Sequence, residues 1–133
     1  MSTTLISLKL DSDIPLYEQL RNQIVLGIAT GKLQPQEKLP TVRQLAEELG
    51  INTMTVNKAY ALLKQEHYIV IDRRHGAKVH AHPGKAAIDE EAADQLEQKL
   101  ELMIAEASLQ GVAADTFYNL CARIYSRMNI QKA

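Results

Sequence analysis

Apolar residues recur with a helical period near the start of the chain. Proline is tolerated in the first turn of a helix, and glycine commonly ends one. The segment between Pro15 and Gly31 carries apolar residues four positions apart, which predicts one inward-facing helical stripe. Its members are Leu16, Leu20, Ile24 and Ile28. The first regular element is therefore expected to be an amphipathic helix.

Two shorter helices are predicted next, separated by only a few residues. The first begins at Thr41, where Thr41 and Gln44 have the spacing of a capping box, and it ends at the following glycine. The second is capped by Asn52 or Thr53 and extends to about Glu66. Two short helices joined by a tight turn with glycine form a helix-turn-helix.

The spacing of apolar residues then changes from helical to alternating. Residues 68–72 and 77–80 predict two strands joined by the polar turn 73–76. A β-hairpin directly after a helix-turn-helix is a wing. Residues 5–10 also alternate, which predicts either a strand or an ordered arm. The fold class is therefore expected to be mainly α with a small β-hairpin, beginning with a winged helix-turn-helix.

Beyond a linker at residues 81–87, two longer amphipathic helices are predicted, at about 89–110 and 114–128. Because one helical hairpin hides two apolar stripes poorly, we expect it to pair with the same hairpin of a second chain. Packing back onto the first helix as a monomer is the alternative. The residues expected at the dimer interface are Leu96, Leu100, Met103, Ile104, Phe117, Leu120, Cys121, Ile124 and Tyr125.

These patterns divide the chain into two predicted domains. Residues 1–82 are expected to form the winged helix-turn-helix domain with its N-terminal arm, and residues 83–133 a two-helix dimerisation or effector tail. The first part has ten basic against eight acidic residues and the second five against eight. A mildly basic front is a weak indication of a nucleic-acid partner, because clustering of charge matters more than its sum.

Composition sets the broad class. The chain is 46% hydrophobic and 23% charged, which is typical of a folded protein. Its 133 residues suit one domain of ordinary size, or a small domain with an appendage. The apolar runs are too short for a membrane span, and the first residues do not resemble a secretory signal. A single cysteine, Cys121, cannot form an internal disulfide. We therefore expect a cytoplasmic protein without membrane association.

The helix-turn-helix and the wing bring polar and basic side chains to one end of the same unit. Double-stranded DNA is read by a helix in the major groove, while cations contact phosphates. Taken singly, these residues are typical of helix caps and solvated turns, but their gathering favours a DNA-binding surface. The predicted contact residues are Thr41, Arg43, Asn52, Thr53, Thr55, Asn57, Lys58, Arg73, Arg74, His75 and Gly76.

Other chemistry is not indicated. The histidines at positions 67, 75, 80 and 82 are close together, which makes a metal site conceivable. His80 and His82 lack a nearby cysteine or a spaced acidic partner, so wing and linker residues are the favoured interpretation and no metal site is predicted. The sequence has no phosphate-binding loop, no dinucleotide-binding glycine pattern and no Ser-His-Asp arrangement. We expect no enzyme activity and no cofactor. A protein-interaction adaptor, with the winged helix as a docking platform, remains the rival function.

Four motifs resemble the DNA-binding domain of the GntR family of bacterial regulators. They are Pro-Leu-Tyr-Glu-Gln-Leu at 15–20, Gly-Lys-Leu at 31–33, Lys-Leu-Pro-Thr-Val-Arg-Gln-Leu-Ala at 38–46 and Asn-Thr-Met-Thr-Val-Asn-Lys-Ala-Tyr at 52–60. The short two-helix tail resembles the YtrA-like branch. The resemblance implies DNA contacts from Arg43, Asn52, Thr53, Thr55, Asn57, His75 and Gly76.

The resemblance also implies a biological role and marks three departures. It implies a homodimeric repressor of a palindromic operator, with target genes for transporters. A small-molecule effector is a further candidate partner, although a two-helix tail offers little volume for a pocket. Gln36 and His67 stand where the family usually has glycine, which concerns local backbone geometry. Thr53 stands where many members have arginine or another long polar residue, so we expect a different base preference.

Overall fold

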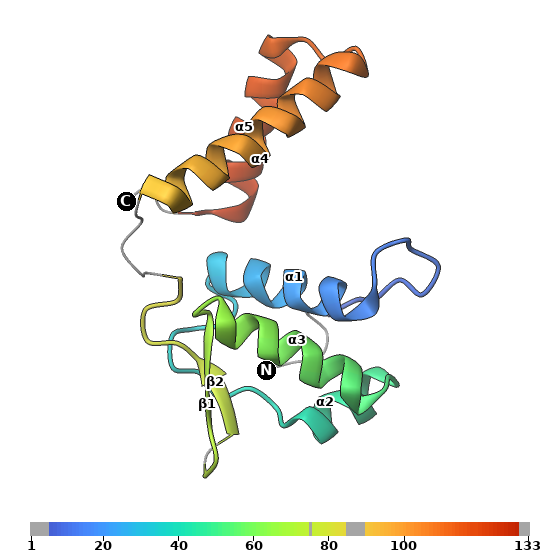
Figure 1. Cartoon of the computed structure of the whole chain (residues 1–133), viewed down its shortest axis with the longest axis vertical. Coiled ribbons are helices and arrows are strands. Elements are labelled where there is room, and N and C mark those ends of the chain that lie inside the picture. The colour runs from blue at the N-terminus through green and yellow to red at the C-terminus, as the bar shows by residue number, and fades with distance from the viewer. Residues whose placement is uncertain (1–5, 75, 85–89, 131–133) are drawn as a thin grey trace. The chain divides into compact units, whose positions relative to one another are not determined.

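The computed structural model describes residues 6–74, 76–84 and 90–130, which fall into two compact units, Met1–Lys85 and Ala86–Ala133. The first unit contains α1 (Leu16–Ala29), α2 (Val42–Leu49), α3 (Thr53–Gln65), β1 (Ile69–Asp72) and β2 (Gly76–Val79), and the second α4 (Glu90–Leu109) and α5 (Ala114–Met128) (Figure 1). No helix in these ranges is long and apolar enough to cross a membrane. The predicted fold class, mainly α with one hairpin, is confirmed.

The core of the first unit forms where α1 crosses α3. Leu20 and Ile24 of α1 and Leu63 of α3 are almost completely buried, as the four-residue spacing predicts. The other helix and the hairpin close this core from the sides with Leu45, Ala46, Ile69 and Val79. The buried face of α3 consists of Val56, Ala59, Tyr60 and Leu63, so the rest of α3 is left for solvent or a partner.

The N-terminal arm lies along α1 but does not form a strand over its described residues 6–10. Gln19 accepts a hydrogen bond from the Lys9 N–H at 2.8 Å and donates one to the Lys9 carbonyl at 2.9 Å. Gln23, one turn further along α1, makes the same two kinds of hydrogen bond with Ser7. Glutamine side chains thus replace a neighbouring strand, and Ile6 is buried in the core. Of the two alternatives for this segment, the ordered arm is confirmed.

The hairpin is joined to the loop before α2. β1 and β2 are antiparallel, with Ile69 opposite Val79 and Asp72 opposite Gly76. On the other edge of β2, the Leu39 N–H donates to the Ala77 carbonyl at 2.9 Å, and a single bridge links Lys38 with Lys78. Because these hydrogen bonds tie the loop to the hairpin, the orientation of the wing is coupled to the start of α2.

Three described residues other than glycine, Gln36, His67 and Asn129, adopt left-handed backbone conformations. Gln36 has φ 66° and His67 has φ 65°. His67 follows Glu66, the C-terminal cap of α3, at the position where glycine is favoured because it has no Cβ. The two departures from the family pattern therefore leave the fold intact but hold strained backbone.

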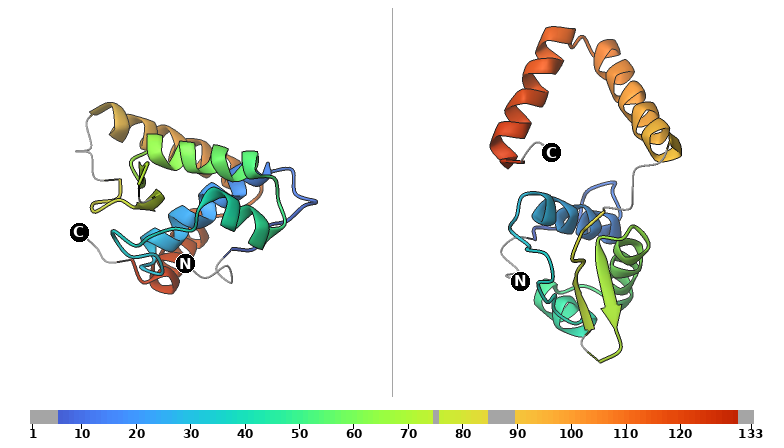
Figure 2. Two further views of the ribbon diagram at one scale, coloured as in Figure 1. Left: turned by 90° about the horizontal axis from the view of Figure 1, so that it is seen from below. Right: turned by 90° about the vertical axis from the view of Figure 1, so that its left-hand side faces the viewer.

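The second unit is a helical hairpin with little interior of its own. Neither α4 nor α5 contains a buried residue, and Gly111, with φ 89°, lies in the turn between them. Figure 2 shows the two helices as the open arms of this hairpin. The two predicted amphipathic helices are confirmed, but the roles assigned to residues 1–82 and 83–133 remain predictions.

Candidate nucleic-acid interface

The start of α2 is fixed by reciprocal hydrogen bonds. The Gln44 N–H donates to the Thr41 hydroxyl at 3.1 Å, and the Thr41 N–H donates to the Gln44 side chain at 3.0 Å. This is the predicted capping box. It sets the position of Arg43, which is exposed in the first turn of α2. Thr41 therefore has a structural role, and its hydroxyl remains able to donate outward.

The turn between α2 and α3 is short, since α2 ends at Leu49 and α3 begins at Thr53. Gly50 adopts φ 67°, and the Ile51 N–H donates to the Ala46 carbonyl at 3.0 Å. Asn52 then caps α3, because its side chain accepts from the Met54 N–H at 2.8 Å. A defined turn of this kind holds the first turn of α3 in a fixed direction relative to α2.

The outer face of α3 differs in part from the expected one. Thr53, Asn57 and Lys58 are exposed, as the helical period predicts. The expectation that Thr55 is also exposed is wrong: it is half-buried, since it lies beside the buried stripe that includes Val56. Met54, which is not among the predicted contact residues, is 76% exposed. Its place three residues before Asn57 on a 3.6-residue period was the signal that could have identified it.

Lys58 is held against α1. Its ammonium nitrogen lies 4.0 Å from the centre of the Tyr17 ring, a cation–π contact that fixes the charge near the edge of the α3 face. This arrangement fits a phosphate contact beside the groove better than a contact with a base.

Tyr60 connects α3 to the loop before α2. Its hydroxyl donates to the Pro40 carbonyl at 2.7 Å, and the residue is 2% exposed. Burial raises the pKa of the Tyr60 hydroxyl, and the nearby Glu48 carboxylate raises it further. The phenol therefore stays neutral and remains a hydrogen-bond donor. Its hydrogen bond holds α3 against the loop that leads into α2.

The wing exposes two arginines. Arg73 and Arg74 are exposed after β1, and the Arg74 N–H donates to the Asp72 carboxylate at 2.8 Å. Gly76 has φ 74° and open space where a Cβ would point, so its backbone is accessible to a partner. The predicted contact from His75 lies outside the described residues.

α2 and the tip of the hairpin lie at the same end of the unit. Figures 1 and 2 show both at the end away from α1. Arg43 of α2, Thr53 of α3 and the two wing arginines are exposed and do not belong to the buried core. Cations on either side of a short polar helix face suit the phosphates and base edges of duplex DNA.

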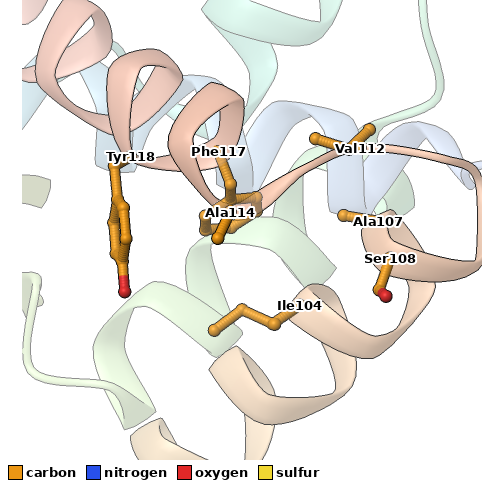
Figure 3. Close-up of a pocket in the computed structure, with 7 residues that line it drawn as sticks. All are labelled: Ile104, Ala107, Ser108, Val112, Ala114, Phe117 and Tyr118. Carbon is orange, nitrogen blue, oxygen red and sulfur yellow. The ribbon is translucent and has the colours of Figure 1, made fainter.

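The residues predicted for dimerisation are accessible in the single chain. Leu96, Leu100 and Met103 are among the exposed side chains of α4, and Phe117, Cys121 and Ile124 are half-buried on α5. A cavity of about 160 Å³ lies where the two helices meet, between Ile104, Ala107, Ser108, Val112, Ala114, Phe117 and Tyr118 (Figure 3). It is smaller than the roughly 300 Å³ at which ligand pockets begin.

The fold and this surface define a DNA-binding transcription regulator of the winged helix-turn-helix class. The family model for bacterial regulatory proteins of the gntR family matches residues 16–79. The chain belongs to the GntR family. A relative that it matches over most of its length supports the same assignment.

That relative is the HTH-type transcriptional repressor YtrA of Bacillus subtilis, 31% identical over 107 residues, which are 80% of this chain and 82% of YtrA. The regulator Rv1152 of Mycobacterium tuberculosis is 48% identical over 50 residues, 38% of this chain, but the chain spans only 41% of its length. The solved structure of YtrA from Sulfolobus acidocaldarius is 36% identical, with a TM-score of 0.62 over 76% of this chain and 98% of that one. These relatives are named as regulators and transcription factors, not as enzymes.

Proposed function

We propose that the protein is a homodimeric repressor that binds a palindromic operator. In this proposal α3 enters the major groove, the wing contacts the backbone or the minor groove, and the tail joins two chains. A two-fold dimer matches a palindrome because each winged helix then reads one half-site, about one helical turn from the other.

The single observation that carries the proposal is the exposed outer face of the first two turns of α3. Thr53 and Asn57 present hydrogen-bonding groups there. An asparagine side chain can form hydrogen bonds with both the N6 donor and the N7 acceptor of adenine in the major groove. Because the opposite face of α3 is buried, this outer face has no role in the core of the unit.

Cations around this face support binding to phosphates. Arg43, Lys58, Arg73 and Arg74 are all exposed, and none is needed to fill the core. Neutralising phosphates releases counterions from DNA, so we expect affinity to fall steeply with salt concentration. Arg43 is also long enough to contact a guanine edge bidentately.

The tail supports a dimer through its uncovered apolar surface. Leu96 is 66% exposed and Ile104 is 46% exposed, although both lie on the apolar stripe of α4. Contiguous apolar surface of this kind typically marks a protein interface. A second copy of the hairpin presents the same stripes, so it is the simplest partner to cover them.

The repressor role is supported by the name of YtrA, a transcriptional repressor that this chain matches over most of its length. Transporter genes as targets, implied by the family resemblance alone, belong to the same proposal. The position of the preferred DNA sequence in the genome tests the repressor role, because a repressor site overlaps the promoter that it blocks. The genes that follow this promoter test whether the targets are transporters.

The test is a selection of binding sequences from random duplex DNA, followed by fluorescence titration of the selected duplex. We expect an inverted repeat. Arg43→Ala is expected to weaken binding by about 1–3 kcal/mol, or roughly 5- to 150-fold, through loss of a phosphate or guanine contact. Lys32→Ala, which removes an exposed cation near the end of α1, is the control and is expected to bind normally.

Two outcomes contradict the proposal. Unchanged affinity when Arg43→Ala and Arg74→Ala are combined eliminates the proposed binding face. If no sequence is enriched and binding is insensitive to salt, the rival function, a protein-interaction adaptor, is favoured.

A further inference from the structure

Met54 is the one large apolar side chain on the outer face of α3 among the described residues. It is 76% exposed, whereas Val56 and Leu63 of the same helix are completely buried. A single exposed apolar residue is ordinary on a protein surface. The position of Met54 within the proposed reading helix therefore carries the inference.

The helical period places Met54 near the middle of the outer face. Asn57 lies three residues after Met54 and Ala61 seven, so the three side chains share one side of α3. Thr55 turns toward the core and Lys58 toward the Tyr17 ring. The middle of the face consequently presents an amide, a thioether and a small methyl group.

The backbone that carries Met54 is fixed before any DNA arrives. The Met54 N–H donates to the Asn52 side chain at 2.8 Å, and the Thr55 N–H donates to the Asn52 carbonyl at 3.0 Å. Helical side chains lean toward the N-terminus, and the N-terminal residues of a recognition helix contact the base edges. In the proposed complex, Met54 is therefore expected to lie near the base edges.

We propose that Met54 reads thymine through van der Waals contact with its C5-methyl group. The inference rests on the proposed function, in which α3 enters the major groove. The thymine methyl is the one apolar group among the major-groove edges of the bases. A methionine side chain offers no hydrogen-bond donor and only a weak acceptor, so apolar contact is its main means of discrimination. Its flexible chain adapts to the methyl position.

The test exchanges thymine for deoxyuridine at each position of the duplex that the selection yields. This exchange removes the methyl group and keeps every hydrogen-bonding group. With the wild-type chain, we expect one thymine per half-site at which the exchange lowers affinity about fourfold, the value of one buried methyl group. With Met54→Ala, the exchange at that thymine is expected to have no effect.

Two further variants separate the contact from its neighbours. Thr53→Ser removes the nearby threonine methyl, and the deoxyuridine effect at the Met54 position is expected to persist. Met54→Gln keeps the length of the side chain but replaces the thioether by an amide, which pairs with adenine. In a repeated selection, Met54→Gln is expected to shift the preferred base at this position from thymine to adenine.

The failures of the two proposals are distinguishable. If Arg43→Ala and Asn57→Ala weaken binding but no deoxyuridine exchange does, or if the effect persists in Met54→Ala, the Met54 inference is overturned and α3 remains the reading helix. If Arg43→Ala and Asn57→Ala leave the affinity for the selected duplex unchanged, the proposed function itself is overturned, and the Met54 inference with it.

Discussion

His67 shows how one residue can conflict with its local conformation. It has φ 65° immediately after Glu66, the C-terminal cap of α3, and its carbonyl accepts from the Gly84 N–H at 3.0 Å. A left-handed conformation costs a residue with a Cβ about 1–2 kcal/mol, and glycine avoids that cost while losing some entropy on folding. The C-terminal end of α3 is therefore expected to be less stable with histidine at position 67 than with glycine.

We predict that His67→Gly raises the free energy of unfolding by about 0.5–1 kcal/mol. Urea unfolding followed by circular dichroism measures the change. His67→Ala is the matched control: it removes the imidazole but keeps the Cβ, and is expected to show no gain. A gain for His67→Ala equal to that for His67→Gly contradicts the backbone explanation and assigns the effect to the imidazole.

At the scale of single residues, the sequence predicts burial better than it predicts outward direction. The apolar stripe of α3, including Val56 and Leu63, follows from its spacing. The helical period predicts that Thr55 lies off the buried stripe and is exposed, yet it lies beside the stripe and is half-buried. Met54 is apolar and therefore lacks the polar character expected of a DNA contact, although its helical period places it on the same side of α3 as Asn57.

The second helix of the first unit depends on the cap at its beginning. Thr41 and Gln44 satisfy each other's backbone N–H groups, which have no partner within the helix. α2 spans only Val42–Leu49, and short helices are marginal on their own. The cap therefore stabilises the helix that presents Arg43.

We predict that Thr41→Ala lowers the free energy of unfolding by about 1 kcal/mol, the usual value of a lost N-cap. Thermal and urea unfolding measure it. Thr41→Ser keeps the hydroxyl and is expected to remain within a few tenths of a kcal/mol of the wild type. Equal losses for the two variants exclude the cap as the cause, because only the alanine variant removes it.

Elements with a strong local pattern were predictable from the sequence. The capping box, the glycine after α2 and the change to alternating apolar residues locate α2, α3 and the hairpin. The arm at residues 6–10 was ambiguous because alternation also fits a strand. Its partners, Gln19 and Gln23, are distant in sequence, and their backbone-pairing role is visible only in three dimensions.

The whole molecule combines a unit with a complete core and a unit without one. The winged helix buries Leu20, Ile24 and Leu63, whereas the helices of the tail bury no residue completely. The sequence predicts the apolar stripes of the tail, but one chain does not contain the surface that covers them. The dimer is therefore proposed from what the single chain leaves exposed.

We predict that the wild-type protein has twice the 14.9 kDa mass of one chain, and that Leu100→Glu shifts it to a monomer. Leu100 lies on the apolar stripe of α4, so a carboxylate there is buried without a partner in the dimer. Leu102→Glu is the matched control, since Leu102 points away from that stripe and is 62% exposed. Sedimentation velocity distinguishes the species.

A wild-type monomer contradicts the proposed dimer. So does the same dissociation in both variants, because it attributes the effect to added charge rather than to the stripe. Retention of the dimer in Leu100→Glu places the interface elsewhere on the chain.

The central claim is that the winged helix reads DNA sequence, and a salt-dependent titration of two duplexes tests it most directly. The selected duplex and a shuffled duplex of the same composition are titrated with the full chain over a series of salt concentrations. We predict at least about 10³-fold tighter binding to the selected duplex. The logarithm of affinity is expected to fall linearly with the logarithm of salt concentration for both. Equal affinity for the two duplexes, or affinity that does not change with salt, contradicts the account.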